Sequence, residues 1–376
     1  MTAAVAAARL PRSGTRSAIP LLINLSMLSN EPTGIANFAR NAVARLRIPV
    51  DQRLLLSAQP LEGMHHRLPV NATMTPLDGL QGHLRRLYWT QFELPRLYQQ
   101  QQAELLFSPL PEAPLNTRVR TVVTVHDLIP LRYRRWSPLQ SYFRFYVPRV
   151  LRNSCHVVCN SRTTADELMQ RWGISARKLT PVALGVDHKL FHQRDRSRTR
   201  DFLYVGTLFP HKNLPRVLNA FALVAPHHPE TSLNIVGTPD HRFLPALQQQ
   251  VRDQGLDGRV HFLGYVPDPQ LPELYARARA LIFPSLWEGF GLPVLEAMAC
   301  GLPVLTSNCA ALPEVAGQAA LMVNPYQTGS IAAAMDELLR DEQLWCDLQR
   351  AGLKRSAQFT WDRTGAELTT VLERFL

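Results

Sequence analysis

The sequence predicts an α/β protein built from two doubly wound, Rossmann-like domains. The chain has 376 residues, which is more than one hydrophobic core usually organises. Short apolar runs alternate with amphipathic runs along its length, as in proteins whose parallel strands are connected by helices. Polar turns that contain glycine follow several of the apolar runs, at the strand ends where ligands bind in doubly wound sheets.

Composition divides the chain into four parts. Residues 1–18 are rich in alanine but interrupted by arginines, so we expect a disordered tail and no signal peptide. Residues 19–192 are expected to form the first domain and residues 193–360 the second, because the polar stretch Lys189–Arg200 is typical of a linker. Residues 361–376 are expected to form a last helix.

The first domain is predicted to begin with a strand, a loop and a helix. The apolar run Leu21–Leu25 is followed by a polar loop that contains Gly34 and by the amphipathic run Ile35–Leu46. Gly34 has no glycine partners at the spacing of a dinucleotide fingerprint, so by itself it indicates only a turn. Further strands are predicted at Leu54–Ala58, Leu105–Phe107, Val119–Val125 and Val157–Cys159.

His126 and Asp127 directly follow the predicted strand Val119–Val125. A histidine and an acid at the carboxyl end of a parallel strand are well placed for a cleft. The alternative is a histidine whose ring is satisfied by backbone groups, and the residues alone leave both interpretations open.

The second domain is predicted to open with the strand Phe202–Val205, a turn over Gly206–Asn213 and a helix from about Leu214. Lys212 lies in this turn, at the mouth of the helix, where a lysine is a suitable partner for phosphate. Further strands are predicted at Ser232–Val236, Arg259–Leu263, Ala280–Phe283, Val304–Thr306 and Leu321–Val323.

The turn after the predicted strand Ala280–Phe283 indicates an anion site. It places Phe290 between Gly289 and Gly291, and a helix is expected from Leu292. The free N–H groups and the positive dipole end of such a helix favour an anion, and glycine lets a phosphate approach the backbone.

Two carboxylates flank this turn. Glu288 precedes it, and Glu296 lies in the expected helix. Each alone is ordinarily a solvated charge, whereas the two together around a Gly-Phe-Gly turn favour a functional pair. One alternative is a retaining glycoside hydrolase that uses Glu288 and Glu296 as acid and nucleophile. Such an enzyme needs its two carboxyls about 5–5.5 Å apart, and a turn that leads into a helix gives no reason to expect that distance.

These residues carry a resemblance to a known family. Glu-Gly-Phe-Gly-Leu-Pro-Val-Leu-Glu-Ala-Met-Ala-Cys-Gly-Leu-Pro-Val resembles the Glu–seven residues–Glu signature of the family 4 retaining glycosyltransferases. The resemblance implies the GT-B fold, in which two Rossmann-like domains face a cleft and a C-terminal helix, here residues 361–376, crosses back to the first domain. It also implies that Glu288 contacts the donor sugar and that Glu296 holds the ribose of the nucleotide.

Other segments extend the resemblance. Val-Thr-Val-His-Asp resembles a family block whose histidine, here His126, lies near the reacting sugar. Gly206–Asn213 resembles Gly-x-x-x-Pro-Arg-Lys-Asn, whose lysine, here Lys212, neutralises the diphosphate. Thr207 and His211 stand where the family often has arginine, so diphosphate affinity is expected to be weaker or supplied differently. The predicted donor site consists of Gly34 beside the diphosphate, Tyr265 beside the base, Gly206, Thr207, His211, Lys212, Gly289, Phe290, Gly291, Leu292 and Glu296, and the predicted catalytic residues are Glu288, His126 and Lys212.

The resemblance implies transfer of a hexose from a nucleotide sugar to a saccharide or lipid-linked acceptor, in cell-surface polysaccharide or glycolipid synthesis. Pro-Thr-Gly-Ile-Ala-Asn-Phe is similar to the mannosyltransferase-like branch, so GDP-mannose is the first expectation and a UDP-sugar the second. No Asp-x-Asp motif is present, and we expect neither a metal nor a cofactor besides the donor. The remaining alternative is a catalytically degenerate nucleotide-sugar-binding protein, which only Thr207 and His211 favour.

Charge is distributed unevenly. Of the net charge of +11, residues 1–190 carry 24 Lys/Arg and 11 Asp/Glu, or +13, and the remainder carries 17 and 19, or −2. Such an asymmetry fits nucleic acid or an anionic membrane. Arginines alternate with aromatic residues over Arg132–Arg152, and Leu84–Trp89 repeats this pattern. A helix packed on the core and a membrane contact explain it equally well, and nucleic acid less well.

The sequence also indicates where in the cell the protein is expected. The five cysteines show no zinc-ligand spacing, which favours a reduced, cytoplasmic protein. The sequence contains no run of about eighteen apolar residues, so we expect no transmembrane helix. We therefore expect a cytoplasmic enzyme, with the inner membrane face as a site of peripheral attachment.

Overall fold

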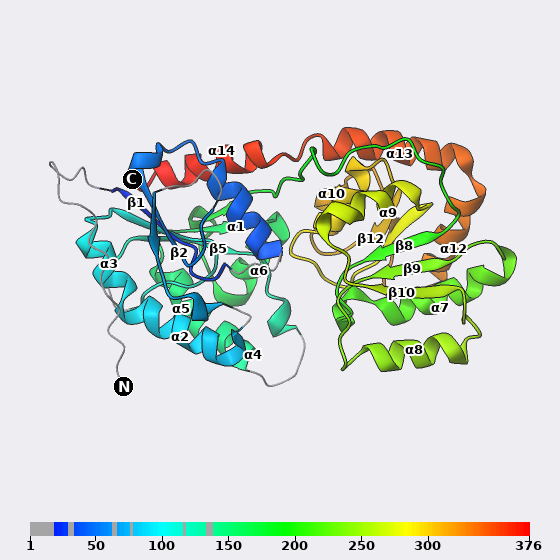
Figure 1. Cartoon of the computed structure of the whole chain (residues 1–376), viewed down its shortest axis with the longest axis horizontal. Coiled ribbons are helices and arrows are strands. Elements are labelled where there is room, and N and C mark those ends of the chain that lie inside the picture. The colour runs from blue at the N-terminus through cyan, green and yellow to red at the C-terminus, as the bar shows by residue number, and fades with distance from the viewer. Residues whose placement is uncertain (1–18, 29–33, 62–65, 76–77, 116–117, 133–137) are drawn as a thin grey trace.

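The computed structural model describes residues 19–28, 34–61, 66–75, 78–115, 118–132 and 138–376 (Figure 1). The predicted tail 1–18 lies outside these ranges, as do Arg134 and Arg135 of the arginine–aromatic segment. The described residues form two parallel sheets with helices on both faces, so the prediction of two Rossmann-like domains is confirmed.

The first sheet has seven parallel strands in the order β3-β2-β1-β4-β5-β6-β7. Helices cover both of its faces, and its central strands are accordingly continuous buried runs. Its strands are β1 (Leu21–Asn24), β2 (Arg53–Ser57), β3 (Arg67–Pro69), β4 (Leu105–Ser108), β5 (Thr121–Val125), β6 (His156–Cys159) and β7 (Leu179–Pro181).

The second sheet has six parallel strands in the order β10-β9-β8-β11-β12-β13. Side chains alternate across it: Phe202 and Tyr204 pack with α7 and α12, whereas Leu203 and Val205 pack with α10. Its strands are β8 (Phe202–Val205), β9 (Leu233–Val236), β10 (Val260–Gly264), β11 (Ala280–Phe283), β12 (Val304–Ser307) and β13 (Leu321–Val323).

Most helices connect successive strands. The first domain has α1 (Gly34–Ala44), α2 (Gly79–Phe92), α3 (Leu94–Gln100), α4 (Pro138–Ser141), α5 (Val147–Asn153) and α6 (Arg162–Trp172), with a π-helical turn η5 (Tyr142–Tyr146) between α4 and α5. The second has the short turn η7 (Pro210–Lys212), α7 (Leu214–Val224), α8 (Leu244–Asp253), α9 (Leu271–Arg277), α10 (Leu292–Ala299), α11 (Leu312–Ala316), α12 (Thr328–Arg340) and α13 (Glu342–Ser356), and α14 (Trp361–Glu373) ends the chain.

Helix α14 returns to the first domain and packs on α1, as Figure 1 shows. Gly365 faces the backbone of Arg45, where an added Cβ would lie 2.5 Å from the carbonyl oxygen. The two connections between the domains also touch, because Val186 forms a parallel bridge with Thr360. The predicted crossing back of the last helix is therefore confirmed.

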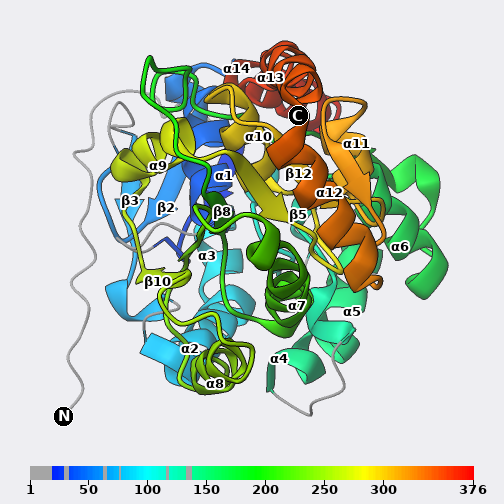
Figure 2. The ribbon, with the colours of Figure 1, turned by 90° about the vertical axis from the view of Figure 1, so that its right-hand side faces the viewer.

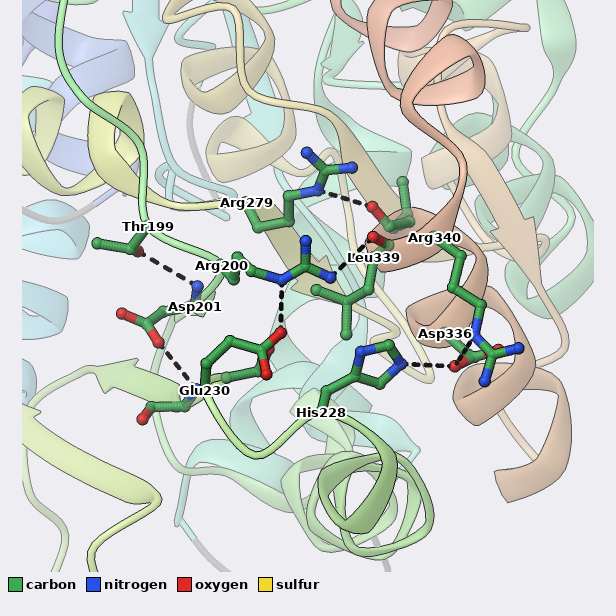
Figure 3. Close-up of polar contacts among 12 residues, drawn as sticks. Thr199, Arg200, Asp201, His228, Glu230, Arg279, Asp336, Leu339 and Arg340 are labelled. Carbon is green, nitrogen blue, oxygen red and sulfur yellow. Dashed lines mark hydrogen bonds and ion pairs between the residues drawn. The ribbon is translucent and has the colours of Figure 1, made fainter.

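The linker is anchored to the second domain at its end (Figure 3). Arg200 pairs with Glu230 at 2.6 Å and donates to the carbonyl oxygen of Leu339 at 3.0 Å. Asp201 accepts a hydrogen bond from the backbone of Ser232 at 2.8 Å. The preceding part of the linker, Phe191–Arg198, forms no helix or strand, but Arg194 and Arg196 both pair with Glu273 of α9.

Candidate active site

An ion pair joins Lys212 of η7 to Glu288 of the loop after β11. Lys212 Nζ lies 2.6 Å from Glu288 Oε1, and the two side chains are only 13% and 9% exposed. Asn213, at a φ of +64°, donates to the carbonyl oxygen of Pro284, and Leu286 N–H donates to that of His211 at 2.7 Å. The two loops are thus tied together by backbone as well as by charge.

The turn before α10 brings the domains into contact. Gly289 lies against the first domain, and an added Cβ would come within 2.1 Å of the carbonyl oxygen of His126. Gly291 has a φ of +116°, a conformation that favours glycine. Phe290 between them is buried and packs edge-on against Phe359. Only glycine at position 289 permits this approach.

His126 lies at the carboxyl end of β5 with both ring nitrogens engaged. Nε2 lies 2.8 Å from the carbonyl oxygen of Pro109, and Nδ1 lies 2.7 Å from the side-chain amide of Asn160. Burial lowers the pKa of His126 to about 4, so the ring is neutral, donating from Nε2 and accepting at Nδ1. In this conformation the ring is satisfied within the protein, as in the alternative stated above, and its part in turnover stays a prediction.

Asp127 places a second carboxyl near the ion pair. Its pKa is raised to about 6, first by burial and then by the carboxylate of Glu288, while the hydrogen bond from Ile129 and the charge of Lys212 oppose the shift. Its Oδ1 accepts a hydrogen bond from the backbone of Ile129 at 2.9 Å. The carboxyl of Asp127 therefore changes its charge just below neutral pH, beside a carboxylate that belongs to the other domain.

Glu296 has surroundings of another kind. It lies on α10, where its Oε2 accepts a hydrogen bond from the hydroxyl of Tyr275 at 3.0 Å. Burial raises the pKa of Glu296 to about 7, which the Tyr275 hydroxyl opposes and Asp268 reinforces. Glu288 is paired with a cation and Glu296 with a hydroxyl, so the two carboxylates lie in different electrostatic surroundings.

Comparison with known proteins gives the family. The family described as Glycosyltransferase Family 4 matches residues 36–190, and that described as Glycosyl transferases group 1 matches residues 188–355. The chain belongs to the family 4 glycosyltransferases. It is a hexosyltransferase of the GT-B fold.

Individual relatives agree with this assignment. The chain is 40% identical over 162 residues to O-antigen chain mannosyltransferase B of Escherichia coli, covering 43% of this chain and 42% of that protein. It is 28% identical to O-antigen chain mannosyltransferase RfbU of Salmonella typhimurium, covering 85% and 90%. The crystal structure of Anabaena Alr3699/HepE in complex with UDP and glucose superposes with a TM-score of 0.75 at 19% identity, covering 94% and 99% of the chains.

The loop after β8 in this glycosyltransferase carries Gly206, Thr207 and His211. Gly206 presents its carbonyl oxygen to Gly237, where an added Cβ would lie 2.0 Å from it. Thr207 is exposed, and His211 stacks on Phe209. Burial, and then the charge of Lys212, lowers the pKa of His211 to about 4. A neutral His211 cannot replace the positive charge of the arginine that the family often has there.

Three further predicted donor-site residues lie at the start of a helix or directly after a strand. Gly34 begins α1 in the first domain, exposed, and an added Cβ there meets no described atom within 4 Å. Tyr265 is exposed after β10, and Leu292 begins α10 half-buried. Their roles stay predictions. Within the described ranges, no group of three or more His, Cys, Asp or Glu side chains is arranged to hold a metal ion, and no helix has the length and apolarity needed to cross a bilayer.

Contacts across the glycosyltransferase's domain boundary include residues that the sequence did not indicate. The carboxylate of Glu314 on α11 accepts from the backbone N–H groups of Arg162 and Thr163, at 3.0 and 3.2 Å, and so caps the N-terminus of α6. The guanidinium of Arg132 lies 3.0 Å from the centre of the Trp287 ring. Both contacts hold the two domains together in the conformation described.

Proposed function

We propose that this glycosyltransferase transfers mannose, with retention of anomeric configuration, from GDP-mannose to a saccharide in the synthesis of a cell-surface polysaccharide. Two relatives named O-antigen mannosyltransferases support this choice, and one of them matches most of both chains. The second domain would bind the donor and the first the acceptor, which is a free or lipid-linked saccharide.

The contact between Lys212 and Glu288 carries the proposal. Transfer leaves a nucleoside diphosphate with growing negative charge, which a fixed cation and the N-terminal amides of α10 would stabilise. Glu288, bonded to that cation at 2.6 Å, would meet the donor sugar. Glu296 of α10, whose carboxylate accepts a hydrogen bond from Tyr275 of α9, would accept from the ribose. This charge stabilisation would come from protein groups, so we propose metal-independent transfer without a cofactor.

The experiment measures GDP release from GDP-mannose with mannose-terminated saccharides as acceptors, and with UDP-glucose and ADP-glucose in place of the donor. We expect GDP release with GDP-mannose only when acceptor is present, undiminished by EDTA, and an α-linked product by NMR. Glu288→Gln should abolish transfer and retain GDP binding by titration calorimetry. Nucleotide binding without transfer in the unaltered enzyme would instead establish the degenerate binding protein.

We also propose an anionic membrane surface as a partner of the first domain, with attachment on the cytoplasmic face. The excess of positive charge in residues 1–190 supports it. The described part of the arginine–aromatic segment divides its side chains, because Tyr142 is buried whereas Arg144, Phe145 and Arg149 are exposed. The buried side fits a helix packed on the core, and the exposed side supports the proposed membrane contact.

A further inference from the structure

One face of α2 carries a row of exposed apolar side chains. Leu80, Leu84, Tyr88 and Phe92 are 52%, 55%, 61% and 55% exposed. Successive members are four residues apart, so each lies only about 40° around the helix from the one before. The buried residues of α2 lie on the opposite side and are Gly82, Arg86, Trp89 and Thr90. The row therefore points away from the domain.

The neighbouring helix extends this surface. Gln91 of α2 donates to the hydroxyl of Tyr146 in η5 at 3.0 Å, which fixes α2 and η5 side by side. Figure 1 and Figure 2 both show α2 and α4 at the same end of the first domain. The α2–η5 face consists of Leu80, Leu84, Tyr88, Phe92, Leu139 and Phe145, and these are six of the twelve large apolar side chains that are exposed in the described part of the chain.

Internal contacts hold this face in place. Arg86, on the buried side of α2, forms a two-bond ion pair with Glu112, at 2.7 and 2.9 Å. Its guanidinium also donates to the carbonyl oxygen of Met74 at 2.9 Å. Because the inner side of α2 is anchored by a buried, fully bonded charge pair, the outward position of the apolar row is set by the fold.

Positive charge borders the α2–η5 face. Arg85 is exposed on α2 beside the row, and Arg144 and Arg149 are exposed on the neighbouring helix. Residues 138–153 contain three arginines and no acidic residue. An apolar strip with a cationic border matches the interface of a bilayer that contains anionic lipids, where apolar side chains enter the acyl boundary and arginines meet headgroups.

We propose that the α2–η5 face inserts into the interface of an anionic membrane and anchors the first domain there. The inference rests on the membrane partner proposed above and names the surface that makes the contact. Scattered exposed apolar residues are ordinary, but four of them on one face of a single helix indicate an interaction surface. Attachment then has two components: charge attraction, which salt screens, and apolar insertion, which salt does not weaken.

Vesicle co-sedimentation separates the two components. The probes are vesicles of phosphatidylcholine alone and of phosphatidylcholine with phosphatidylglycerol, at low and high salt. We expect Leu84→Gln combined with Phe92→Gln to reduce partition onto anionic vesicles by at least about tenfold at both salt concentrations. Arg144→Gln combined with Arg149→Gln should weaken binding to anionic vesicles at low salt and leave binding at high salt unchanged.

Leu223→Gln combined with Leu263→Gln is the matched control, because it removes two exposed leucines from the second domain. This control should bind vesicles like the unaltered protein, and all variants should keep the same melting temperature and the same GDP affinity. Full vesicle binding by the α2 variant, or an equal loss in the control, overturns the proposal. The proposal is also overturned if size-exclusion chromatography shows a dimer that the α2 variant no longer forms and that vesicles do not dissociate. Transfer to a water-soluble acceptor should be unchanged in the α2 variant, so a failure here is distinct from a failure of the proposed transfer.

Discussion

Replacing Glu296 by glutamine should stabilise the unliganded protein above neutral pH. The pKa of Glu296 in the folded protein is about 7, against 4.5 for the ordinary side chain. The folded state therefore binds this proton more tightly than the unfolded state. The resulting stabilisation is complete below pH 4.5 and is lost as the pH rises through 7, because the buried carboxyl must then ionise.

The magnitude follows from the two pKa values. The difference between 4.5 and about 7, at about 1.36 kcal/mol per pH unit, gives about 3 kcal/mol as the largest effect at pH 8. Glutamine stays neutral and avoids this loss, while its side-chain oxygen can still accept from Tyr275. For a domain of this size the gain in melting temperature is on the order of 5–10 °C.

The assay is thermal unfolding of both proteins at pH 5 and pH 8. Glu337→Gln, which removes an exposed carboxylate from α12, controls for the change in net charge. A melting temperature of Glu296→Gln that is not raised at pH 8, or that is raised equally at pH 5, would refute the reasoning. The substitution should also weaken GDP binding about fivefold, because a charge-assisted hydrogen bond becomes a neutral one that is weaker by about 1 kcal/mol.

Four further predictions concern the cleft. Lys212→Ala should raise the donor KM and lower kcat, each by about tenfold or more. The reason is that the diphosphate charge that Lys212 neutralises exists in the bound donor and grows at the transition state. Steady-state kinetics with both values unchanged would show that Lys212 is an ordinary surface lysine. Gly289→Ala should lower kcat at least tenfold and leave GDP affinity intact by calorimetry, since its Cβ would collide with the His126 carbonyl of the other domain. His126→Ala should lower kcat and leave the donor KM nearly unchanged, and full turnover would return it to a purely structural role. Glu314→Gln should weaken the cap on α6 by about 1 kcal/mol, which small-angle scattering would detect as a larger radius of gyration and kinetics as a raised acceptor KM.

Much of the fold could be predicted because parallel strands buried on both faces are continuous apolar runs. β8, β11 and β13 have the predicted bounds, and the other predicted strands differ by one or two residues at an end. β3 and β7 were not predicted. Each is an edge strand of three residues that ends in proline, Pro69 and Pro181, and their burial is partial. Such segments have neither the length nor the apolar character from which a strand is predicted.

The candidate site could be predicted only in part, for a related reason. Glu288 and Lys212 were found through local motifs, but they lie 76 positions apart, and no local spacing indicates their ion pair. Asn160, Tyr275 and Glu314 have no motif at all. Their significance comes from partners that only the folded chain brings near, so their contacts depend on the packing of strands and domains and cannot be read from neighbouring residues.

The position of Asp127 links domain closure to protonation. Its carboxyl belongs to the first domain, yet its pKa is raised in part by Glu288 of the second. A pKa that depends on the other domain must change when the domains separate, and by linkage protonation of Asp127 must then favour the closed arrangement. Lys212 opposes this effect from the same side as Glu288. A bound diphosphate would pair with Lys212, which would then neutralise less of the negative charge of Asp127 and Glu288. We therefore expect closure over the donor to be favoured when Asp127 is neutral, which a smaller radius of gyration of the GDP-bound protein at pH 5 than at pH 8 would show.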